Sequence, residues 1–284
     1  MRMEVTPLDA TFGATISGIM IAGLDDAEFT EIYDLWLRYS LLIFPAQHLE
    51  NDQQVTFAKR FGALEIDLVE LSNVNEDGDL RTAPDDDRIK ILKGNMSWHH
   101  DSTYMPVQAK GAVFRADEVP STGGETGWAD MCAAYDALDD AMRRRIEGLS
   151  AHHSLIYSQS KAGFQHKDKD SEYNGYGLNQ EEAPLRPLAK THSETGRRTL
   201  TIGRHAHAIP GLPSLQSEAL LTELIDFACQ PPRIYHHSWA PGDVVVWDNR
   251  CLMHQARPWD MGERRVMYHS RLAGDPVHEF GAPK

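Results

Sequence analysis

The chain is organised around the stretch Ser97-Trp98-His99-His100-Asp101-Ser102-Thr103-Tyr104. In an extended strand, side chains two residues apart point to the same face, so we predict that His99 and Asp101 project together while His100 faces away. An imidazole and a carboxylate on one face supply two of the three ligands in the two-histidine, one-carboxylate triad that holds non-haem Fe(II) and leaves coordination positions open. The stretch therefore predicts a candidate metal site.

The spacing alone is weak evidence for such a site. About one His-x-Asp pair is expected by chance in a chain of this composition. A second one occurs at His166-Lys167-Asp168, inside a polar run without a strand pattern. Apolar and aromatic neighbours such as Trp98 and Tyr104 distinguish the first pair from the second, and the bland alternative is that His99 and Asp101 are ordinary polar residues.

Composition limits the class of protein. A chain of 284 residues with 41% hydrophobic residues can bury a full core. The formal charge of −14 argues against nucleic acid or an anionic membrane as the main partner. Three widely spaced cysteines favour a reducing cytoplasm over a disulfide framework. The first residues lack a signal-peptide core, and no apolar run reaches the length of a membrane span. We therefore predict an acidic, cytoplasmic globular protein.

Hydrophobic periodicity predicts helices alternating with buried strands. One helix is capped by Asp25-Asp26 and runs to Tyr39, and a second is capped by Asn51, with Gln54 at the capping-box position. Two further helices are expected at 132–149 and 215–229. Strands are expected at 15–21, 41–45, 97–104, 111–116, 199–203 and 243–248, at the segment beginning at His254, and at 264–271.

Two stretches are predicted to be loops. Residues 75–88 are acidic and rich in turn residues, which favours a solvated loop over an acidic binding site. Residues 161–182 are polar and contain three glycines. A loop of this length is usually functional or disordered, and the functional version is a lid over the active site.

Two strand faces carry candidate functional side chains. His205 and His207 form a same-face pair, but a metal site there has no nearby carboxylate or cysteine, so pocket lining or a structural role is favoured. Arg265, His269 and Arg271 share one face of the 264–271 strand. Two arginines on one strand face of an acidic protein suggest a local anion site, and surface salt bridging is the alternative.

As a set, these residues resemble a known family. His99-x-Asp101, the spacing of ten residues between His254 and Arg265, and Gly123-Gly124-x-Thr126 between them resemble the TauD/TfdA family of Fe(II)/2-oxoglutarate dioxygenases. The resemblance runs nearly end to end. Two strings look closest to the (S)-phenoxypropionate, or aryloxyalkanoate, dioxygenases: Asn95-Met96-x-Trp98-His99-x-Asp101-Ser102-Thr103-Tyr104 and Ile202-Gly203-Arg204-His205-Ala206-His207-Ala208-Ile209-Pro210-Gly211.

The resemblance implies a mainly β fold with flanking helices and a double-stranded β-helix, or jelly-roll, core in a single domain spanning 1–284. It assigns His99, Asp101 and His254 to Fe(II) as the catalytic centre, with O2 as a co-substrate. Thr126 and Arg265, together with Asn95, would bind the co-substrate 2-oxoglutarate. A planar guanidinium suits bidentate binding of a carboxylate.

One departure from the family pattern concerns the substrate. Many relatives carry a substrate-binding arginine four residues after the 2-oxoglutarate arginine, whereas this chain has His269 there and an arginine two residues later, Arg271. We predict that Arg271, helped by His269 and His205, holds the carboxylate of a small anionic substrate. The implied reaction hydroxylates the carbon next to the ether oxygen of an aryloxyalkanoate, giving a phenol, a 2-keto acid, succinate and CO2.

Three alternatives remain open from the sequence. The same chemistry could act on taurine, an alkyl sulfate or another small organic acid. A zinc hydrolase could use the His/Asp/His set, although this leaves Thr126 and Arg265 unexplained. A non-catalytic jelly-roll binding protein is disfavoured because every ligand position is present. The sequence is compatible with a homo-oligomer.

Overall fold

A computed structural model describes residues 3–81, 83, 86–163 and 183–281. Its largest element is a seven-stranded sheet with the order β1-β2-β3-β13-β5-β15-β4. All neighbouring strands in it are antiparallel except the pair β2 and β3. The bounds of its strands are β1 Glu4–Pro7, β2 Ala14–Ser17, β3 Leu41–Phe44, β4 Leu64–Ser72, β5 Gly111–Glu118, β13 Val244–Asp248 and β15 Val266–Leu272.

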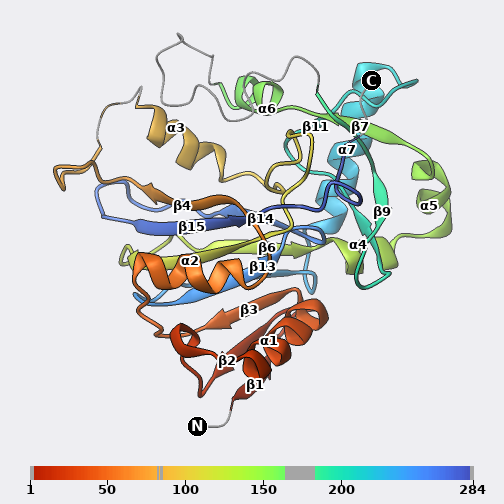
Figure 1. Cartoon of the computed structure of the whole chain (residues 1–284). Helices are drawn as coiled ribbons and strands as arrows, with labels where there is room; N and C mark the ends of the chain where they lie inside the picture. Colours follow the sequence, from red (N-terminus) through yellow and green to blue (C-terminus); the bar gives the residue numbers. More distant parts are fainter. Residues whose placement is uncertain (1–2, 82, 84–85, 164–182, 282–284) are drawn as a thin grey trace.

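A second, antiparallel sheet faces the first and has the order β12-β6-β14. Its strands are β12 Ile234–His237, β6 Thr126–Asp130 and β14 Leu252–Ala256. Buried side chains from both sheets form one cluster, among them Phe114 and Trp247 from the large sheet and Trp128 from the small one. This is the jelly-roll core with flanking helices that we predicted (Figure 1).

Strict alternation along β13 explains how the layers are held together. Val244 and Val246 belong to the core between the large sheet and the N-terminal helices, whereas Val245 and Trp247 belong to the core between the two sheets. Because both faces of the strand are covered, its apolar run is continuous. The covering helices are α1 Asp26–Tyr39 and α2 Asn51–Lys59 (Figure 1).

The helix starts agree with the sequence analysis to within one residue. Asp25 caps α1 with a complete capping box, as predicted. For α2 the capping box is formed by Glu50 and Gln53, one residue earlier than we predicted. The reason is that Gln54 points into the protein, where its amide donates to the carbonyl oxygens of Val113 and Tyr268.

The predicted helix at 132–149 is two helices. They are α4 Met131–Ala137 and α5 Asp140–Ile146. Leu138 adopts an extended conformation between them, and the Asp139 carboxylate accepts a hydrogen bond from the backbone of Met142, which starts the second helix. The apolar face of both helices nevertheless reaches one core, so the periodicity was read correctly and the break was missed.

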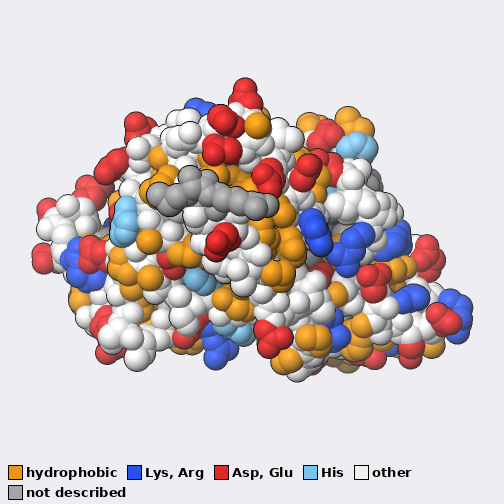
Figure 2. Space-filling view, turned by 90° about the horizontal axis from the view of Figure 1, so that it is seen from below, with side chains coloured by type: hydrophobic (Ala, Val, Ile, Leu, Met, Phe, Trp, Pro, Cys, Tyr) orange, Lys and Arg blue, Asp and Glu red, His pale blue; other side chains and the backbone are white. Residues whose placement is uncertain are grey.

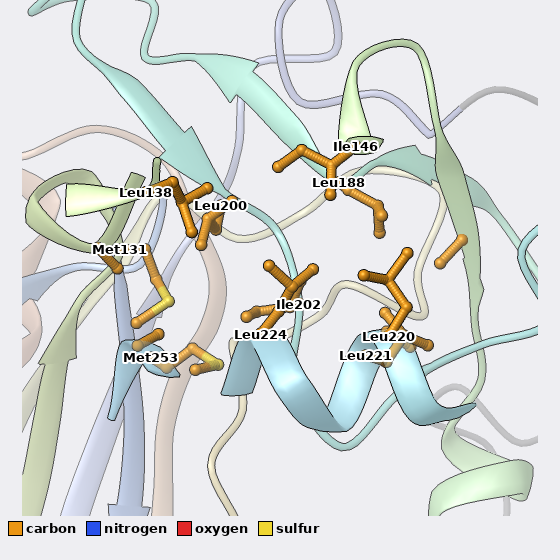
Figure 3. Packing of buried hydrophobic residues seen from close by; sticks show 14 of the residues in the cluster. Met131, Leu138, Ile146, Leu188, Leu200, Ile202, Leu220, Leu221, Leu224 and Met253 are labelled. Carbon is orange, nitrogen blue, oxygen red and sulfur yellow. The ribbon is translucent and has the colours of Figure 1, made fainter. Parts of the chain in front are cut away.

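That core lies on the outer side of the small sheet. The predicted helix at 215–229 is α7 Ser214–Ala228, and its Leu220, Leu221 and Leu224 pack with Met253 of β14 (Figure 3). Around this core lie the small strands β7 Ser150–His153, β8 Leu185–Pro187, β9 Ala189–Thr191, β10 Arg198–Leu200 and β11 Ala206–His207. Strand β10 is shorter than the predicted strand at 199–203.

Three local predictions were wrong. The strand expected at 15–21 ends at Ser17 and is followed by the 3-10 helix η1 Ile21–Gly23. The acidic region continues into an unpredicted helix, α3 Asp87–Gly94, because the Asp86 side chain caps it and its apolar residues pack against Trp259. The segment 97–104 is not a strand.

The predicted lid at 161–182 is largely outside the described residues. Its first residue ends α6 Leu155–Lys161, and residues 164–182, including the second His-x-Asp pair, are not described. Among the described helices, none has the length and apolar character needed to cross a bilayer. On the face shown in Figure 2, acidic and basic side chains are interspersed.

Candidate active site

A cavity of about 250 Å³ opens between the two sheets. Its walls combine side chains from the small sheet, the large sheet, α3 and the segment that follows α3. These include every site residue predicted from the sequence: Asn95, His99, Asp101, Thr126, His205, His254, Arg265, His269 and Arg271. The structure therefore brings the predicted set together, and each side chain's role follows from its contacts.

His99 and His254 are paired through their backbones. The His99 amide donates to the His254 carbonyl at 3.0 Å, and the His254 amide donates to the His99 carbonyl at 2.8 Å. This isolated antiparallel bridge places the two ring centroids 4.2 Å apart. We had predicted that His254 begins its strand, whereas it lies at the centre of β14.

Asp101 reaches the same point from a turn. Asn249 fixes the turn because its side chain accepts from the Asp101 amide at 2.8 Å and donates to the Asp101 carbonyl at 3.0 Å. Asp101 Oδ2 lies 3.9 Å from His254 Nε2, and ligand atoms of His99, Asp101 and His254 lie within 4.8 Å of one another. The three residues converge as predicted, but through a bridge and a turn instead of alternation along a strand.

The protonation states suit a metal ion. His99 Nδ1 lies 2.7 Å from the Ser97 carbonyl oxygen, which can only accept, so Nδ1 carries the proton and Nε2 is free to ligate. Burial lowers the pKa of His254 to about 4, and burial together with His254 holds the pKa of His99 well below its usual value. Burial would raise the pKa of Asp101, but Arg271 and His254 outweigh it and lower that pKa. Neutral imidazoles and an ionised carboxylate are what a divalent cation requires.

Arg265 also lines the cavity and has no carboxylate partner in the part of the chain that the structure describes. Its side chain is buried, stacks on Trp259 and donates from Nε to the Gly124 carbonyl at 3.2 Å. Burial alone lowers its pKa to about 10, and no ion pair to it is found among the described residues. A buried guanidinium without a counter-ion is costly unless a ligand supplies the charge.

The Thr126 hydroxyl proton is available for a hydrogen bond to a ligand. The Trp239 indole N–H, which can only donate, reaches the Thr126 hydroxyl oxygen at 3.0 Å, so the threonine keeps its own proton for another acceptor. The preceding Gly123 and Gly124 both have positive φ, and a Cβ at Gly124 would lie 3.2 Å from Arg265 Nε. The predicted glycine loop thus wraps the arginine, and Trp239 is a supporting residue that the sequence did not single out.

Arg271 and His269 lie beside the Asp101 carboxylate. Arg271 Nη2 is 3.1 Å from Asp101 Oδ1, and His269 Nε2 is 3.4 Å from Asp101 Oδ2. The shared inward face of Arg265, His269 and Arg271 therefore agrees with the alternation predicted for β15. Burial lowers the pKa of His269 although Asp101 opposes the shift, so this imidazole is neutral near pH 7.

The predicted pairing of His205 with His207 was wrong. His205 lies in a turn, lines the cavity and contacts the Tyr104 ring, whereas His207 stacks on Tyr157 outside that cavity. The Ser158 hydroxyl donates to the Leu155 carbonyl, so it accepts from His205 Nδ1 at 2.9 Å. Burial lowers the pKa of His205 well below its usual value. It therefore supplies no positive charge near neutral pH.

Asn95 lines the same cavity as His99, Asp101 and His254. Its carbonyl accepts from the Ala256 amide at 2.8 Å, which ties the end of α3 to β14. Its side chain faces the cavity, and its predicted contact with the co-substrate stays a prediction. Two cavity-lining arginines, Arg88 and Arg204, were missed because they stand outside the strand pattern that identified Arg265.

A second group of ligand-type side chains, His192, Asp248 and Cys251, does not suit a metal ion. Arg250 donates to both oxygens of the Asp248 carboxylate, at 2.8 and 2.6 Å, and His192 contacts the same group at 2.9 Å. Hydrogen bonding to Cys132, burial and nearby Asp248 raise the pKa of Cys251, so its thiol stays protonated. The buried guanidinium takes the place that a cation would need.

Two histidines and one carboxylate thus lie around a single point, and an arginine without an ion-pair partner among the described residues lines the same cavity, which suits a divalent metal ion and an anionic ligand. The family described as "Taurine catabolism dioxygenase TauD, TfdA family" matches residues 4–271. This chain belongs to that family.

Known relatives match almost end to end. An (S)-phenoxypropionate/alpha-ketoglutarate-dioxygenase from Sphingobium herbicidovorans is 64% identical over 277 residues, covering 97% of this chain and 96% of the relative. A protein of the same name from Delftia acidovorans is 57% identical over 287 residues, covering 99% and 98%. The solved structure of AAD-2 in complex with Mn(II) and N-oxalylglycine has a TM-score of 0.90 and 33% identity, with full coverage of both chains.

Proposed function

We propose that this protein is an Fe(II)- and 2-oxoglutarate-dependent dioxygenase of aryloxyalkanoates, of the phenoxypropionate and phenoxyacetate type. The observation that carries the proposal is Arg265, a buried guanidinium that has no counter-ion among the described residues and lines the same cavity as a His/Asp/His set. A hydrolytic metal site would not need such an arginine. The names of the two relatives quoted above support both the chemistry and the substrate class.

The residues at the metal end fit the ion. His99 presents Nε2, Asp101 presents Oδ2, and His254 Nε2 faces that oxygen. Three protein ligands leave positions for a chelating co-substrate and for O2. Bound Fe(II), with 2-oxoglutarate and O2, supplies the oxidising chemistry of the site. The protein's own contribution is to keep the two histidines neutral and the Asp101 carboxylate ionised, and to position the substrate.

Arg265 and Thr126 are proposed to hold the distal carboxylate of 2-oxoglutarate. Arg265 supplies the positive charge, and Thr126 supplies a hydroxyl proton that its contact with Trp239 leaves available. Charge-assisted contacts of this kind are roughly twice as strong as neutral ones. The co-substrate would therefore be fixed at one end by the protein and at its keto-acid end by the metal.

The reaction balances without a protein acid or base. O2 accepts four electrons, two from the oxidative decarboxylation of 2-oxoglutarate and two from the carbon–hydrogen bond of the substrate. One oxygen atom enters succinate, and the other becomes a hydroxyl on the carbon next to the ether oxygen. The resulting hemiketal or hemiacetal breaks its ether bond, which releases a phenol and leaves a 2-keto acid.

The rest of the cavity suits an aromatic acid. Apolar side chains line it, including Leu71, Phe114 and Trp247, and these provide a surface for an aryl ring while excluding water from the metal. Cations on different sides of the cavity could meet the substrate carboxylate. They are Arg271, the residue predicted from the sequence, and Arg88 and Arg204.

Other family members named for different substrates define the second candidate. An "Alkylsulfatase" from Acinetobacter baylyi is 29% identical over 291 residues, so the same oxidative chemistry on a small sulfate ester is the alternative to test. Taurine remains a third substrate predicted from the sequence. The zinc-hydrolase alternative shares the His/Asp/His set but leaves the buried Arg265 and the Thr126 hydroxyl without a role.

The test is O2 uptake by the purified protein with Fe(II), across (S)- and (R)-2-phenoxypropionate, phenoxyacetate, taurine and an alkyl sulfate. We expect uptake to require 2-oxoglutarate, with phenol and succinate formed in about equal amounts from a phenoxy acid. Uptake only with taurine or the sulfate would refute the substrate class. Turnover that is independent of 2-oxoglutarate and O2 would refute the chemistry.

The location, the domain organisation and the oligomeric state of the protein are also part of our proposal. We infer that the protein acts in the cytoplasm on a small anionic substrate, since its three cysteines are unpaired. Residues 1–284 are proposed to form one domain, because the two sheets share one buried cluster. A homo-oligomer stays a prediction, which analytical ultracentrifugation would test.

A further inference from the structure

The Asp101 carboxylate presents its two oxygens to different partners. Oδ1 lies 3.1 Å from Nη2 of Arg271, which makes it an acceptor of a charge-assisted hydrogen bond. Oδ2 is buried and has no hydrogen-bond partner of good geometry among the described residues, and it faces His269 Nε2 at 3.4 Å and His254 Nε2 at 3.9 Å. One oxygen is therefore held by the protein and the other is directed at the metal position.

Arg271 is itself held in place. Its strand, β15, lies between β4 and β5, and its side chain is 12% exposed. Its Nη1 lies 3.4 Å from the hydroxyl of Ser102, the residue next to Asp101. That hydroxyl donates at 2.9 Å to Glu65 of β4. The guanidinium thus links the turn that carries Asp101 to β15, and the Ser102 hydroxyl links the same turn to β4.

We propose that Arg271 is a positioning residue for Asp101, holding Oδ1 so that only Oδ2 binds the metal. A carboxylate free to turn could bind through both oxygens and occupy a further coordination position. Restricting it to one oxygen keeps positions open for the chelating co-substrate and for O2. The inference rests on the proposed function for the identity of the metal and co-substrate, and it gives Arg271 a different role from the substrate contact predicted from the sequence.

The arrangement of charges favours this role. Asp101 is a buried carboxylate, and the Arg271 guanidinium lies 3.1 Å from its Oδ1. If the guanidinium moved to a substrate carboxylate, Asp101 Oδ1 would lose its charged partner during turnover. The other cavity arginines, Arg88 and Arg204, are not in that position, because neither contacts the Asp101 carboxylate in any interaction described.

The experiment measures metal binding without any substrate. Binding of Mn(II) to the purified metal-free protein is followed by calorimetry for the wild type, Arg271→Ala, Arg271→Lys and a matched control, Arg264→Ala. Arg264 precedes Arg265 and pairs with Glu118 at the surface, away from the cavity. Loss of an outer partner of a metal ligand typically weakens metal binding about 10- to 100-fold. We expect that loss in Arg271→Ala, partial recovery in Arg271→Lys, and unchanged affinity in Arg264→Ala.

A spectroscopic measurement keeps the inference testable if the alanine variant folds poorly. The visible charge-transfer absorption of a 2-oxoacid chelated to Fe(II) is recorded without O2 in Arg271→Lys. We expect a shifted or weakened band, since the shorter ammonium cannot reproduce the guanidinium contact. Unchanged metal affinity and an unchanged band, with a tenfold or greater rise in the KM for (S)-2-phenoxypropionate, would overturn the proposal and assign Arg271 to the substrate. Weakened Mn(II) binding in a protein inactive on every phenoxy acid would uphold the inference and refute the proposed substrate instead.

Discussion

Two buried arginines in this protein have opposite surroundings. Arg250 and Arg265 are each 3% exposed. Arg250 contacts Asp248 through two nitrogens and also reaches Glu194, and these carboxylates outweigh burial and raise its pKa. Arg265 has a carbonyl and an indole ring as neighbours, and burial lowers its pKa to about 10. Arg250 therefore has its counter-ions within the protein, whereas no carboxylate of the described residues pairs with Arg265.

We interpret this difference as that between a structural cation and a ligand-binding one. Burial of either guanidinium costs desolvation energy, and the carboxylates of the protein offset that cost at Arg250. In our proposal a carboxylate of 2-oxoglutarate offsets it at Arg265, and the same burial would strengthen that contact. The predictions below perturb each side of the comparison in turn.

The largest effect is expected at the metal centre that shares its cavity with Arg265. Asp101→Ala should abolish turnover, because the remaining two imidazoles do not complete the ligand set. O2 uptake and Mn(II) binding are the measurements. Asp67→Ala removes an exposed aspartate of β4 and serves as the control. Normal turnover by Asp101→Ala, or by wild-type protein from which a chelator has removed all metal, would rule the site out.

Removing the compensated arginine should mainly affect folding. Arg250→Ala leaves Asp248 buried without its cation, and breaking a buried pair in this way costs about 3–5 kcal/mol. Urea unfolding should therefore show a large loss of stability, while the KM for 2-oxoglutarate of the folded fraction stays near the wild-type value. A raised KM with unchanged stability would reverse the roles that we give to the two arginines.

Removing the uncompensated arginine should mainly affect the co-substrate. Arg265→Ala is expected to lose about 2–4 kcal/mol of binding to 2-oxoglutarate, or roughly 30- to 1000-fold in apparent KM. The KM for the phenoxy acid should change far less, and the free energy of unfolding should stay within about 1 kcal/mol of the wild type. Steady-state kinetics with each substrate varied separately would check this. A rise confined to the phenoxy-acid KM would mean that Arg265 binds the prime substrate.

The smallest effect is a difference in acid stability. Burial would raise the pKa of Asp248, but Arg250 outweighs it and holds this pKa well below the ordinary value near 3.9. A depressed carboxyl pKa stabilises the fold above the unfolded-state pKa, and this stabilisation is lost as the pH falls toward the folded-state pKa. Between pH 5 and pH 3 the wild type should lose about 1 kcal/mol more than Asp248→Asn. Parallel pH profiles in urea titrations would contradict the pairing.

The sequence predicts what depends on local periodicity and misses what depends on long-range pairing. The buried strand β13, the alternation along β15 and the Asp25 cap of α1 depend on local patterns, and all three were predicted correctly. The bridge that joins His99 to His254 is a contact between distant segments, so we predicted a strand where the chain makes a bridge and a turn. Asn249, which fixes Asp101, was read only as a turn residue for the same reason.

Composition and periodicity also led to two wrong predictions of helix position. Helix α3 follows an acidic, turn-rich stretch and is stabilised by packing of its apolar residues against Trp259, which no local pattern indicates. The break between α4 and α5 preserves the periodicity of the apolar face, so the sequence there resembles one continuous helix. The candidate site residues were predicted because their types and spacings match a family, while their contacts could be read only from the structure.

The most direct test of the account is calorimetric titration of 2-oxoglutarate into Mn(II)-loaded protein, with wild type, Arg265→Ala and Arg264→Ala compared. Mn(II) without prime substrate separates binding from turnover. We predict saturable binding at one site in the wild type and in Arg264→Ala, dependent on the metal, and a loss of roughly 30- to 1000-fold in Arg265→Ala. Equal affinity in all three proteins, or binding that does not require the metal, would contradict the account.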